Sequence, residues 1–275
     1  MSRPPTPHVP GADIPAIGFG TSSLGAHCGE IVAAALAAGY RHIDTARKYG
    51  SEPGVGEGLR AARVPRADVF LTTKVSHEHL RADDFARSVD ASLTTLGVDH
   101  VDALLVHWPN PAIPLAETMG ALARAKRQGL ARHVGVANFN IAMIDEAIRL
   151  CAEPLVMVQA EFHPYLDQRR LLAACRERAL VYTGYCPLGR GRLIGDAVIG
   201  EIARKTGRTA AQVALRWSIQ QGVVPIPRSS RPRRIAENLD VFAFSLGDDD
   251  MRAISALARR DGRIADPAGR APAWD

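Results

Sequence analysis

The chain has 275 residues, a mass of 29.6 kDa and a net charge of +5, a size that allows either two small domains or one large α/β barrel. Hydrophobic residues make up 47% of it and charged residues 23%, which indicates a globular protein with a real core. The arginines are scattered among acidic residues and no apolar segment has the length of a bilayer span, so neither a nucleic-acid nor a membrane partner is expected.

Strand-type and helix-type patterns alternate along the chain, with no low-complexity linker between them. A proline-rich, hairpin-like lead is expected over residues 1–13, and Gly39 is a natural C-cap for the first helix. Strands are expected at residues 14–20, 40–46, 69–75, 101–108, 133–139, 156–162, 180–185 and 223–227. Helices are expected at residues 31–38, 55–62, 83–96, 115–128, 142–150, 169–178, 199–206, 210–220, from 232 onward, and at 249–258.

Eight successive strand–helix units predict an α/β fold of the (β/α)8 TIM barrel type, with one domain over residues 1–275. An extra C-terminal helix and a tail over residues 259–275 would cover the barrel mouth. The alternative is a doubly wound open sheet, which usually needs a glycine-rich phosphate loop after its first strand. The segment GFGTSS at residues 18–23 does not complete that motif, because residue 23 is Ser23.

Three of the expected strands end in titratable side chains. Lys74 lies near the end of the third strand, where an ammonium is costly to desolvate unless a partner or a task holds it. Asp44 and His107 occupy the ends of the second and fourth strands, and Tyr49 lies in the loop after Asp44. Because a barrel gathers the C-terminal ends of its strands around its active site, we expect these four side chains to share one site.

The chemistry of these four residue types fits protonation of an oxygen while a hydride arrives at carbon. A tyrosine with a pKa of about 10 is a weak acid at neutral pH, and the nearby ammonium of Lys74 is expected to lower the pKa of Tyr49. Asp44 can pair with Lys74 and hold it in place. His107 can donate a hydrogen bond to a carbonyl oxygen and orient it.

Short segments along nearly the whole chain resemble the aldo-keto reductase family, and in particular its small bacterial members of the 2,5-diketo-gluconate-reductase type. The segments are GYRHIDTA at residues 39–46, YGSE at 49–52, TTK at 72–74, LVHWP at 105–109, GVANF at 135–139, QAEFHPY at 159–165, PLGRG at 187–191 and IPRS at 226–229. The resemblance implies a (β/α)8 barrel that binds NADPH without a Rossmann domain, in agreement with the missing glycine loop.

The resemblance also implies a role for each matching residue. Tyr49 would be the general acid, activated by Lys74 and Asp44, and His107 would orient the carbonyl. The substrate would contact Tyr49, His107, Trp108 and, in the tail, Trp274. NADPH would contact Thr21, Asp44, Asn138, Gln159, Tyr185, Leu188, Arg190, Arg228, Ser229, Arg234, Glu237 and Asn238. Guanidiniums such as Arg228 and Arg234 bind phosphate with forked hydrogen bonds, and the start of a helix near residue 232 offers free N–H groups to an anion.

The sequence therefore predicts an NADPH-dependent reductase that converts aldehydes or ketones into alcohols. A cytoplasmic location is expected, because the start of the chain lacks the apolar stretch of a signal peptide. A monomer is also expected. No metal or disulfide is predicted, because the four cysteines show no paired spacing. Two alternatives remain open: a non-catalytic nucleotide-sensing subunit of the same superfamily, and a lyase that uses Lys74 as a Schiff base.

Overall fold

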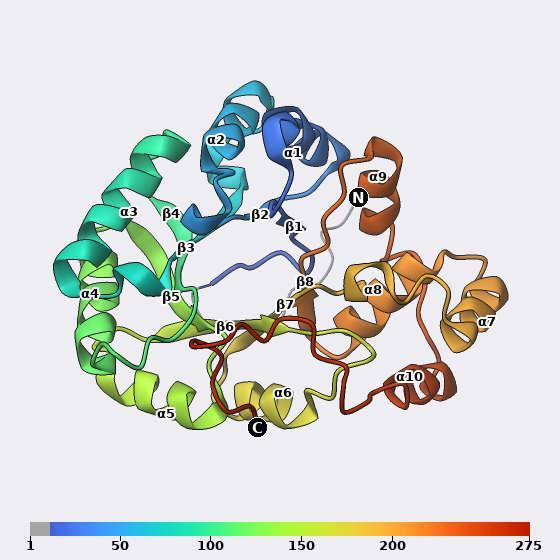
Figure 1. The fold of residues 1–275 in the computed structure, drawn as a ribbon. Coiled ribbons are helices and arrows are strands. Elements are labelled where there is room, and N and C mark those ends of the chain that lie inside the picture. Colours follow the sequence, from blue (N-terminus) through green and yellow to red (C-terminus); the bar gives the residue numbers. More distant parts are fainter. Residues whose placement is uncertain (1–11) are drawn as a thin grey trace.

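The computed structural model describes residues 12–275, so most of the lead expected at residues 1–13 lies outside the described residues. Eight parallel strands follow one another around one sheet in the order of the sequence, as Figure 1 shows. The strands are β1 (Phe19–Gly20), β2 (His42–Asp44), β3 (Phe70–Val75), β4 (Val101–Val106), β5 (Ala131–Ala137), β6 (Leu155–Glu161), β7 (Val181–Tyr185) and β8 (Val223–Pro225).

Backbone hydrogen bonds close the sheet between its first and last strands. The Gly18 N–H donates to the Pro225 carbonyl at 2.9 Å, and the Gly20 N–H donates to the Pro227 carbonyl at 3.0 Å. The predicted (β/α)8 barrel is therefore confirmed, and the open sheet is excluded. Because all strands run in the same direction, their C-terminal ends meet at one end of the barrel.

Helices surround the barrel (Figure 1), and each contributes buried apolar residues to the main hydrophobic core. Thr209 caps its helix with a capping box to Gln212, and Gly39 ends the first helix at a φ of +115°. The helices are α1 (Cys28–Ala38), α2 (Glu52–Ala61), α3 (Ala82–Leu96), α4 (Leu115–Arg127), α5 (Ile141–Leu150), α6 (Arg169–Glu177), α7 (Ala197–Thr206), α8 (Ala210–Gln220), α9 (Pro232–Leu239) and α10 (Asp248–Ser255). Within residues 12–275 no helix combines the length and the apolar character that crossing a membrane requires.

The first strand is much shorter than expected. Residues 14–17 were predicted to be part of it, but only Phe19 and Gly20 pair as a strand. Pro15 has no N–H to donate to a ladder. Ile14 is fully buried in a second apolar cluster with Leu105 and Met157 from β4 and β6, so the residues before β1 add to the core without joining the sheet.

Candidate active site

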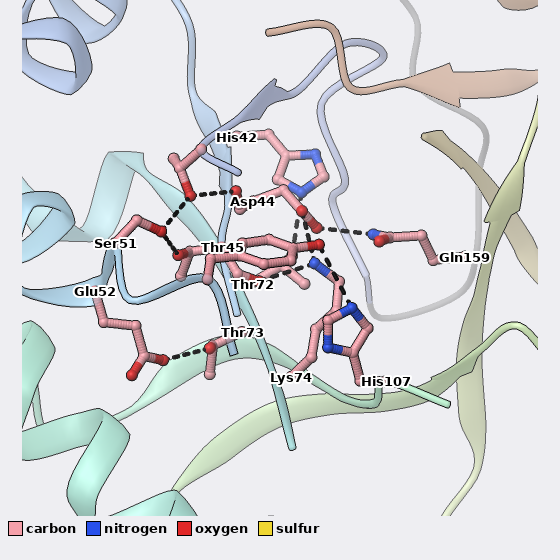
Figure 2. A network of polar contacts seen from close by, with 12 residues as sticks. His42, Asp44, Thr45, Ser51, Glu52, Thr72, Thr73, Lys74, His107 and Gln159 are labelled. Atoms are coloured by element: carbon pink, nitrogen blue, oxygen red, sulfur yellow. Dashed lines mark hydrogen bonds and ion pairs between the residues drawn. The ribbon is translucent and has the colours of Figure 1, made fainter. Parts of the chain in front are cut away.

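The four candidate catalytic side chains lie together at the C-terminal end of the barrel. Figure 2 shows Asp44, Lys74 and His107 near one another, and Tyr49 contacts His107 and Lys74. Asp44 is the last residue of β2, Lys74 is the penultimate residue of β3, and His107 directly follows β4. Tyr49 ends the 3₁₀ turn Arg47–Tyr49 that follows β2. Neighbouring strands of the barrel therefore bring these residues together, as the sequence pattern predicted.

A buried ion pair lies at the base of this site. The Lys74 Nζ atom lies 2.6 Å from Asp44 Oδ1 and 2.8 Å from the Thr45 carbonyl oxygen. The second carboxylate oxygen of Asp44 accepts a hydrogen bond from Gln159 Nε2 at 2.7 Å. Burial by itself works to lower the pKa of Lys74, but Asp44 and Tyr49 outweigh it and raise that pKa. Lys74 is therefore a permanent ammonium at neutral pH.

Tyr49 points its hydroxyl toward His107, with 3.5 Å between Tyr49 Oη and His107 Nε2. The Lys74 ammonium lies 5.2 Å from the centre of the Tyr49 ring. Burial raises the pKa of Tyr49 and is the largest influence on it, while Lys74 acts in the opposite direction. The expectation of a lowered pKa was therefore wrong in its net direction. The phenol is fully protonated at neutral pH, which is the form that can donate a proton.

His107 is held as a neutral imidazole. Burial, followed by the charges of Lys74 and Arg270, lowers its pKa well below the usual value. Its backbone is fixed on both sides, since its N–H donates to the Val75 carbonyl at 2.9 Å and its carbonyl accepts from Asn138 Nδ2 at 2.8 Å. A neutral ring keeps one N–H for donation and adds no positive charge to the site.

A chain of buried hydroxyls supports Asp44 from behind, and sequence reasoning missed most of it. Thr21 Oγ1 donates to the Asp44 carbonyl at 3.1 Å and lies 3.2 Å from Ser51 Oγ, which in turn lies 3.1 Å from Thr45 Oγ1 (Figure 2). Thr73 Oγ1 also donates to Glu52 at 2.6 Å. The sequence signal that could have indicated this network was a set of polar residues inside segments that are otherwise apolar. A network of buried hydrogen bonds fixes the geometry of the groups that it contacts.

A cavity of about 770 Å³ opens above these residues. It runs from Tyr49 and His107 to the cations at the start of α9. Nine of the expected cofactor contacts line it: Thr21, Asp44, Asn138, Gln159, Tyr185, Leu188, Arg190, Arg228 and Arg234. Lys74 lies below the cavity floor, where it contacts Asp44 rather than the open space.

Three of the expected cofactor contacts do not line the cavity. The Ser229 hydroxyl accepts from the Arg231 N–H at 3.1 Å and so closes its own turn. Glu237 accepts from the Thr209 hydroxyl at 2.8 Å, and Asn238 is buried within α9. Ser229 is thus engaged locally, whereas Glu237 contacts the N-cap of α8, a tertiary contact that the local sequence does not reveal.

Asn138 and Tyr185 form a linked pair on the cavity wall. Asn138 adopts the left-handed backbone region with φ at +64°, which asparagine tolerates better than most residues. Its Oδ1 accepts a hydrogen bond from the Tyr185 hydroxyl at 2.8 Å. The ring of Tyr185 is thereby held at the cavity, where a flat ligand ring can stack on it.

Several loop residues also line the cavity without having been predicted. Arg228 bridges two sides of it, because its guanidinium donates to the Ser23 carbonyl at 3.0 Å. The unpredicted lining residues are Gly20, Ser22, Ser23, Cys186, Pro187, Gly191, Ile194, Ile226, Pro227 and Ala265. Ser23 and Cys186 have positive φ angles. Their place at the cavity follows from this backbone conformation, which their residue types do not indicate.

The C-terminal tail lies against the ends of β4, β5 and β6 (Figure 1). Glu161, the last residue of β6, accepts the N–H groups of Ile264 and Ala265 at 2.7 Å each and contacts His163 at 2.7 Å. Burial works to raise the pKa of Glu161, but these hydrogen bonds outweigh it and lower that pKa. A permanent carboxylate therefore anchors the tail beside the cavity.

The two tryptophans expected at the substrate have different positions. Trp108 lines the cavity, whereas Trp274 packs edge-on against Trp108 with 6.2 Å between ring centres and does not line it. The Trp274 indole N–H donates to Asp266 at 2.9 Å. Trp274 therefore supports the wall that Trp108 presents.

Comparison with known proteins agrees with this geometry. The model of the aldo/keto reductase family matches residues 16–259. An aldo-keto reductase of Mycolicibacterium vanbaalenii is 42% identical over 246 residues, which cover 89% of this chain and 88% of the relative. Methylglyoxal reductase DkgB of Salmonella typhimurium is 39% identical over 269 residues, which cover 95% of this chain and 99% of the relative.

Solved structures give the same result. A putative 2,5-diketo-D-gluconic acid reductase B superposes with a TM-score of 0.94 at 46% identity, over 96% of this chain and 95% of the other. A mutant of Gox0644 in complex with NADPH superposes with a TM-score of 0.87 at 38% identity, over 92% of this chain and 93% of the other.

Proposed function

Because this chain belongs to the aldo/keto reductase family, we propose that it reduces aldehydes or ketones to alcohols with Tyr49 as the proton donor. It is an NAD(P)H-dependent oxidoreductase with NADPH as its cofactor. The observation that carries the proposal is the phenol of Tyr49 at the cavity, 3.5 Å from His107 and above the Lys74–Asp44 ion pair. Relatives named for methylglyoxal and for 2,5-diketo-D-gluconic acid favour small dicarbonyl compounds as substrates.

The protein's part of the reaction is to deliver one proton and to stabilise the charge that this creates. NADPH supplies a hydride to the carbonyl carbon when it is bound. Tyr49 gives its hydroxyl proton to the carbonyl oxygen, and the Lys74 ammonium stabilises the phenolate that remains. The neutral ring of His107 donates a hydrogen bond to the same oxygen and orients it. Asp44 holds Lys74 in place and supplies the negative charge that balances the buried ammonium.

The residues along the cavity fit NADPH in charge and in shape. The amides of Asn138 and Gln159 would meet the carboxamide, and the Tyr185 ring would stack on the nicotinamide. The cations Arg228 and Arg234 line the far end, where fork-shaped guanidiniums suit a phosphate. In this proposal the nicotinamide would lie near Tyr49 and the phosphates far from it.

Loss of Arg228 is expected to weaken NADPH binding selectively. A hydrogen bond to a charged group contributes about 1.5–3 kcal/mol, so Arg228→Ala should raise the Kd for NADPH about 10- to 100-fold. The Kd for NADH, which lacks the 2′-phosphate, should change far less. Fluorescence titration of both nucleotides checks this. Arg231→Ala is the matched control, since Arg231 is exposed and does not line the cavity. Equal weakening for both nucleotides would contradict a phosphate contact.

The pH dependence of reduction follows from the pKa shifts of His107 and Tyr49. The pKa of His107 is lowered well below its ordinary value and that of Tyr49 is raised, so neither group changes its charge near neutrality. We expect kcat to be flat across the pH at which an ordinary histidine titrates, about 6.5. A break in the kcat profile near that pH, absent in His107→Gln, would show that His107 becomes protonated during turnover.

The lyase alternative needs Lys74 as a neutral, accessible amine. Its ammonium is instead buried, paired with Asp44 and raised in pKa, so its nucleophilic form is suppressed. Borohydride should therefore trap no carbonyl compound on Lys74, and a trapped adduct there would favour the lyase.

The nucleotide-sensing alternative predicts NADPH binding without turnover of any compound in a broad aldehyde panel.

A further inference from the structure

The residue before Tyr49 ties its turn to the next loop at the mouth of the barrel. The Lys48 Nζ atom lies 2.7 Å from one carboxylate oxygen of Glu78 and 2.8 Å from the other. Lys48 belongs to the 3₁₀ turn Arg47–Tyr49 that follows β2. Glu78 belongs to the 3₁₀ turn His77–His79 that follows β3. The ion pair therefore bridges the loops after two neighbouring strands.

The carboxylate of this pair is also fixed from its own side of the bridge. Glu78 accepts a hydrogen bond from the Ser76 hydroxyl at 2.8 Å. The Lys48 ammonium, followed by this hydroxyl, lowers the pKa of Glu78 to about 2. The carboxylate therefore stays charged at every pH near neutrality, and the bridge is intact there.

A further contact extends the bridge from the turn of Tyr49 to the loop of His107. Asn110 lies in the loop that begins with His107 after β4, and its Nδ2 donates to the His77 carbonyl at 2.8 Å. His77 begins the turn that carries Glu78. A path of polar contacts therefore runs along the rim of the barrel between the two loops that carry the proposed proton donor and the residue that orients the carbonyl.

The direction of the Tyr49 side chain depends on how this turn is held. The turn is short, closed by the Tyr49 N–H to the Ala46 carbonyl at 3.0 Å and by the Gly50 N–H to the Arg47 carbonyl at 3.1 Å. Gly50, at a φ of +67°, has no side chain that could support the ring. Tyr49 Oη lies 3.5 Å from His107 Nε2, so a small shift of the turn takes this pair beyond hydrogen-bond range.

We propose that the Lys48–Glu78 ion pair is a positioning device for the reaction, which keeps the Tyr49 hydroxyl aligned with the carbonyl oxygen that His107 orients. The inference rests on the proposed reductase function and adds two residues that do not line the cavity. Their side chains are 49% and 45% exposed, and an exposed pair contributes little to stability. Its effect is therefore expected in the chemical step, where misplacement of a reacting group by about 1 Å can cost about 100-fold in rate.

Exchange of the two charges tests the proposal. Single-turnover oxidation of bound NADPH is measured with the neutral substrate 4-nitrobenzaldehyde in the wild type, Lys48→Glu, Glu78→Lys and Lys48→Glu/Glu78→Lys. Each single reversal should slow the reaction about 3- to 10-fold, because it places two like charges at the bridge. The exchanged variant keeps the combined length of the two side chains and should recover the wild-type rate to within about twofold. The Kd for NADPH should be unchanged in all four proteins.

The solvent isotope effect separates positioning from a general loss of structure. In the single reversals the proton transfer from Tyr49 limits the rate more strongly, so the solvent deuterium isotope effect should rise, and the exchanged variant should return it to the wild-type value. Lys48→Met and Glu78→Gln place no like charges together. They give the same comparison, with a smaller decrease in rate, if a reversal variant does not fold.

A matched lysine–glutamate pair provides the control. Lys126 Nζ lies 3.3 Å from a carboxylate oxygen of Glu153. Lys126 is in the last turn of α4, which leads into the N-terminal end of β5 and thus to the end of the barrel away from the site. Lys126→Glu and Lys126→Glu/Glu153→Lys should leave both the rate and the isotope effect at the wild-type values.

Each outcome has a distinct meaning. Single reversals that react at the wild-type rate would overturn the inference and leave the reductase function standing. An exchanged variant as slow as Lys48→Glu would also overturn it, because the charge of Lys48 would then act on the site directly rather than through Glu78. If the wild type reduces no carbonyl compound, the proposed function fails and the inference fails with it.

Discussion

Tyr49→Phe is expected to fold, to bind NADPH with nearly unchanged affinity, and to lose about 10²- to 10⁴-fold in kcat for carbonyl reduction, the usual contribution of a positioned general acid. The change removes only the hydroxyl that faces His107. The ring itself packs edge-on against the His107 ring, with 5.4 Å between centres, and phenylalanine keeps that contact. Stopped-flow or steady-state measurement of NADPH oxidation with a small aldehyde checks the prediction.

A second tyrosine provides the matched control. Tyr40 is fully buried, its hydroxyl has no partner among the described residues, and it does not line the cavity. Tyr40→Phe therefore removes the same atom from the same type of residue away from the site, and it should leave kcat near the wild-type value. Wild-type turnover in Tyr49→Phe would refute the role of Tyr49 as proton donor.

Lys74→Met is expected to cost both stability and activity. It leaves the Asp44 carboxylate buried beside an apolar side chain, and removal of one member of a buried ion pair costs about 3–5 kcal/mol of the free energy of unfolding. The phenolate of Tyr49 also loses the cation that stabilises it, so kcat should fall at least about 100-fold. Urea denaturation and NADPH oxidation measure the two effects separately.

A double-mutant cycle separates the ion pair from simple packing. In Asp44→Asn/Lys74→Met both charges are absent, so the double variant should be less destabilised than the sum of the two single variants. Lys205→Met is the control, because Lys205 is largely exposed in its pair with Asp250 and the loss of an exposed ion pair costs no more than about 1 kcal/mol. Additive costs at Asp44 and Lys74 would contradict a coupled pair.

The barrel and the four catalytic candidates could be predicted from the sequence because both depend on local pattern. Strand-type runs showed where Asp44, Lys74 and His107 end their strands, and the barrel then dictates that those ends converge. The prediction made the first strand too long, because the apolar residues before Phe19 suggested that they also pair in the sheet. Ile14 is indeed buried, but in a core cluster rather than in the sheet, and burial alone does not distinguish the two.

The remaining features depend on tertiary structure. The direction of the pKa shift of Tyr49 depends on how deeply the phenol is buried. The sequence pattern indicates a nearby lysine but not the depth of burial. Ser229 lies outside the cavity because its hydroxyl closes its own turn, and Glu237 and Asn238 do so because they are engaged or buried where α9 packs. Arg263 lies over the ring of Trp274 and Arg270 near the ring of Trp108, and no local pattern in the sequence indicates these contacts of the tail.

Transfer of an isotope label tests the central claim most directly. The wild-type protein is incubated with a small dicarbonyl compound and with NADPH that carries deuterium at both C4 positions of the nicotinamide, and the alcohol is analysed by mass spectrometry. The reductase proposed here should place one deuterium on the carbinol carbon for each NADPH consumed, and Tyr49→Phe should form little labelled alcohol. Oxidation of NADPH that yields an unlabelled alcohol, or labelled product formed by Tyr49→Phe at the wild-type rate, would contradict it.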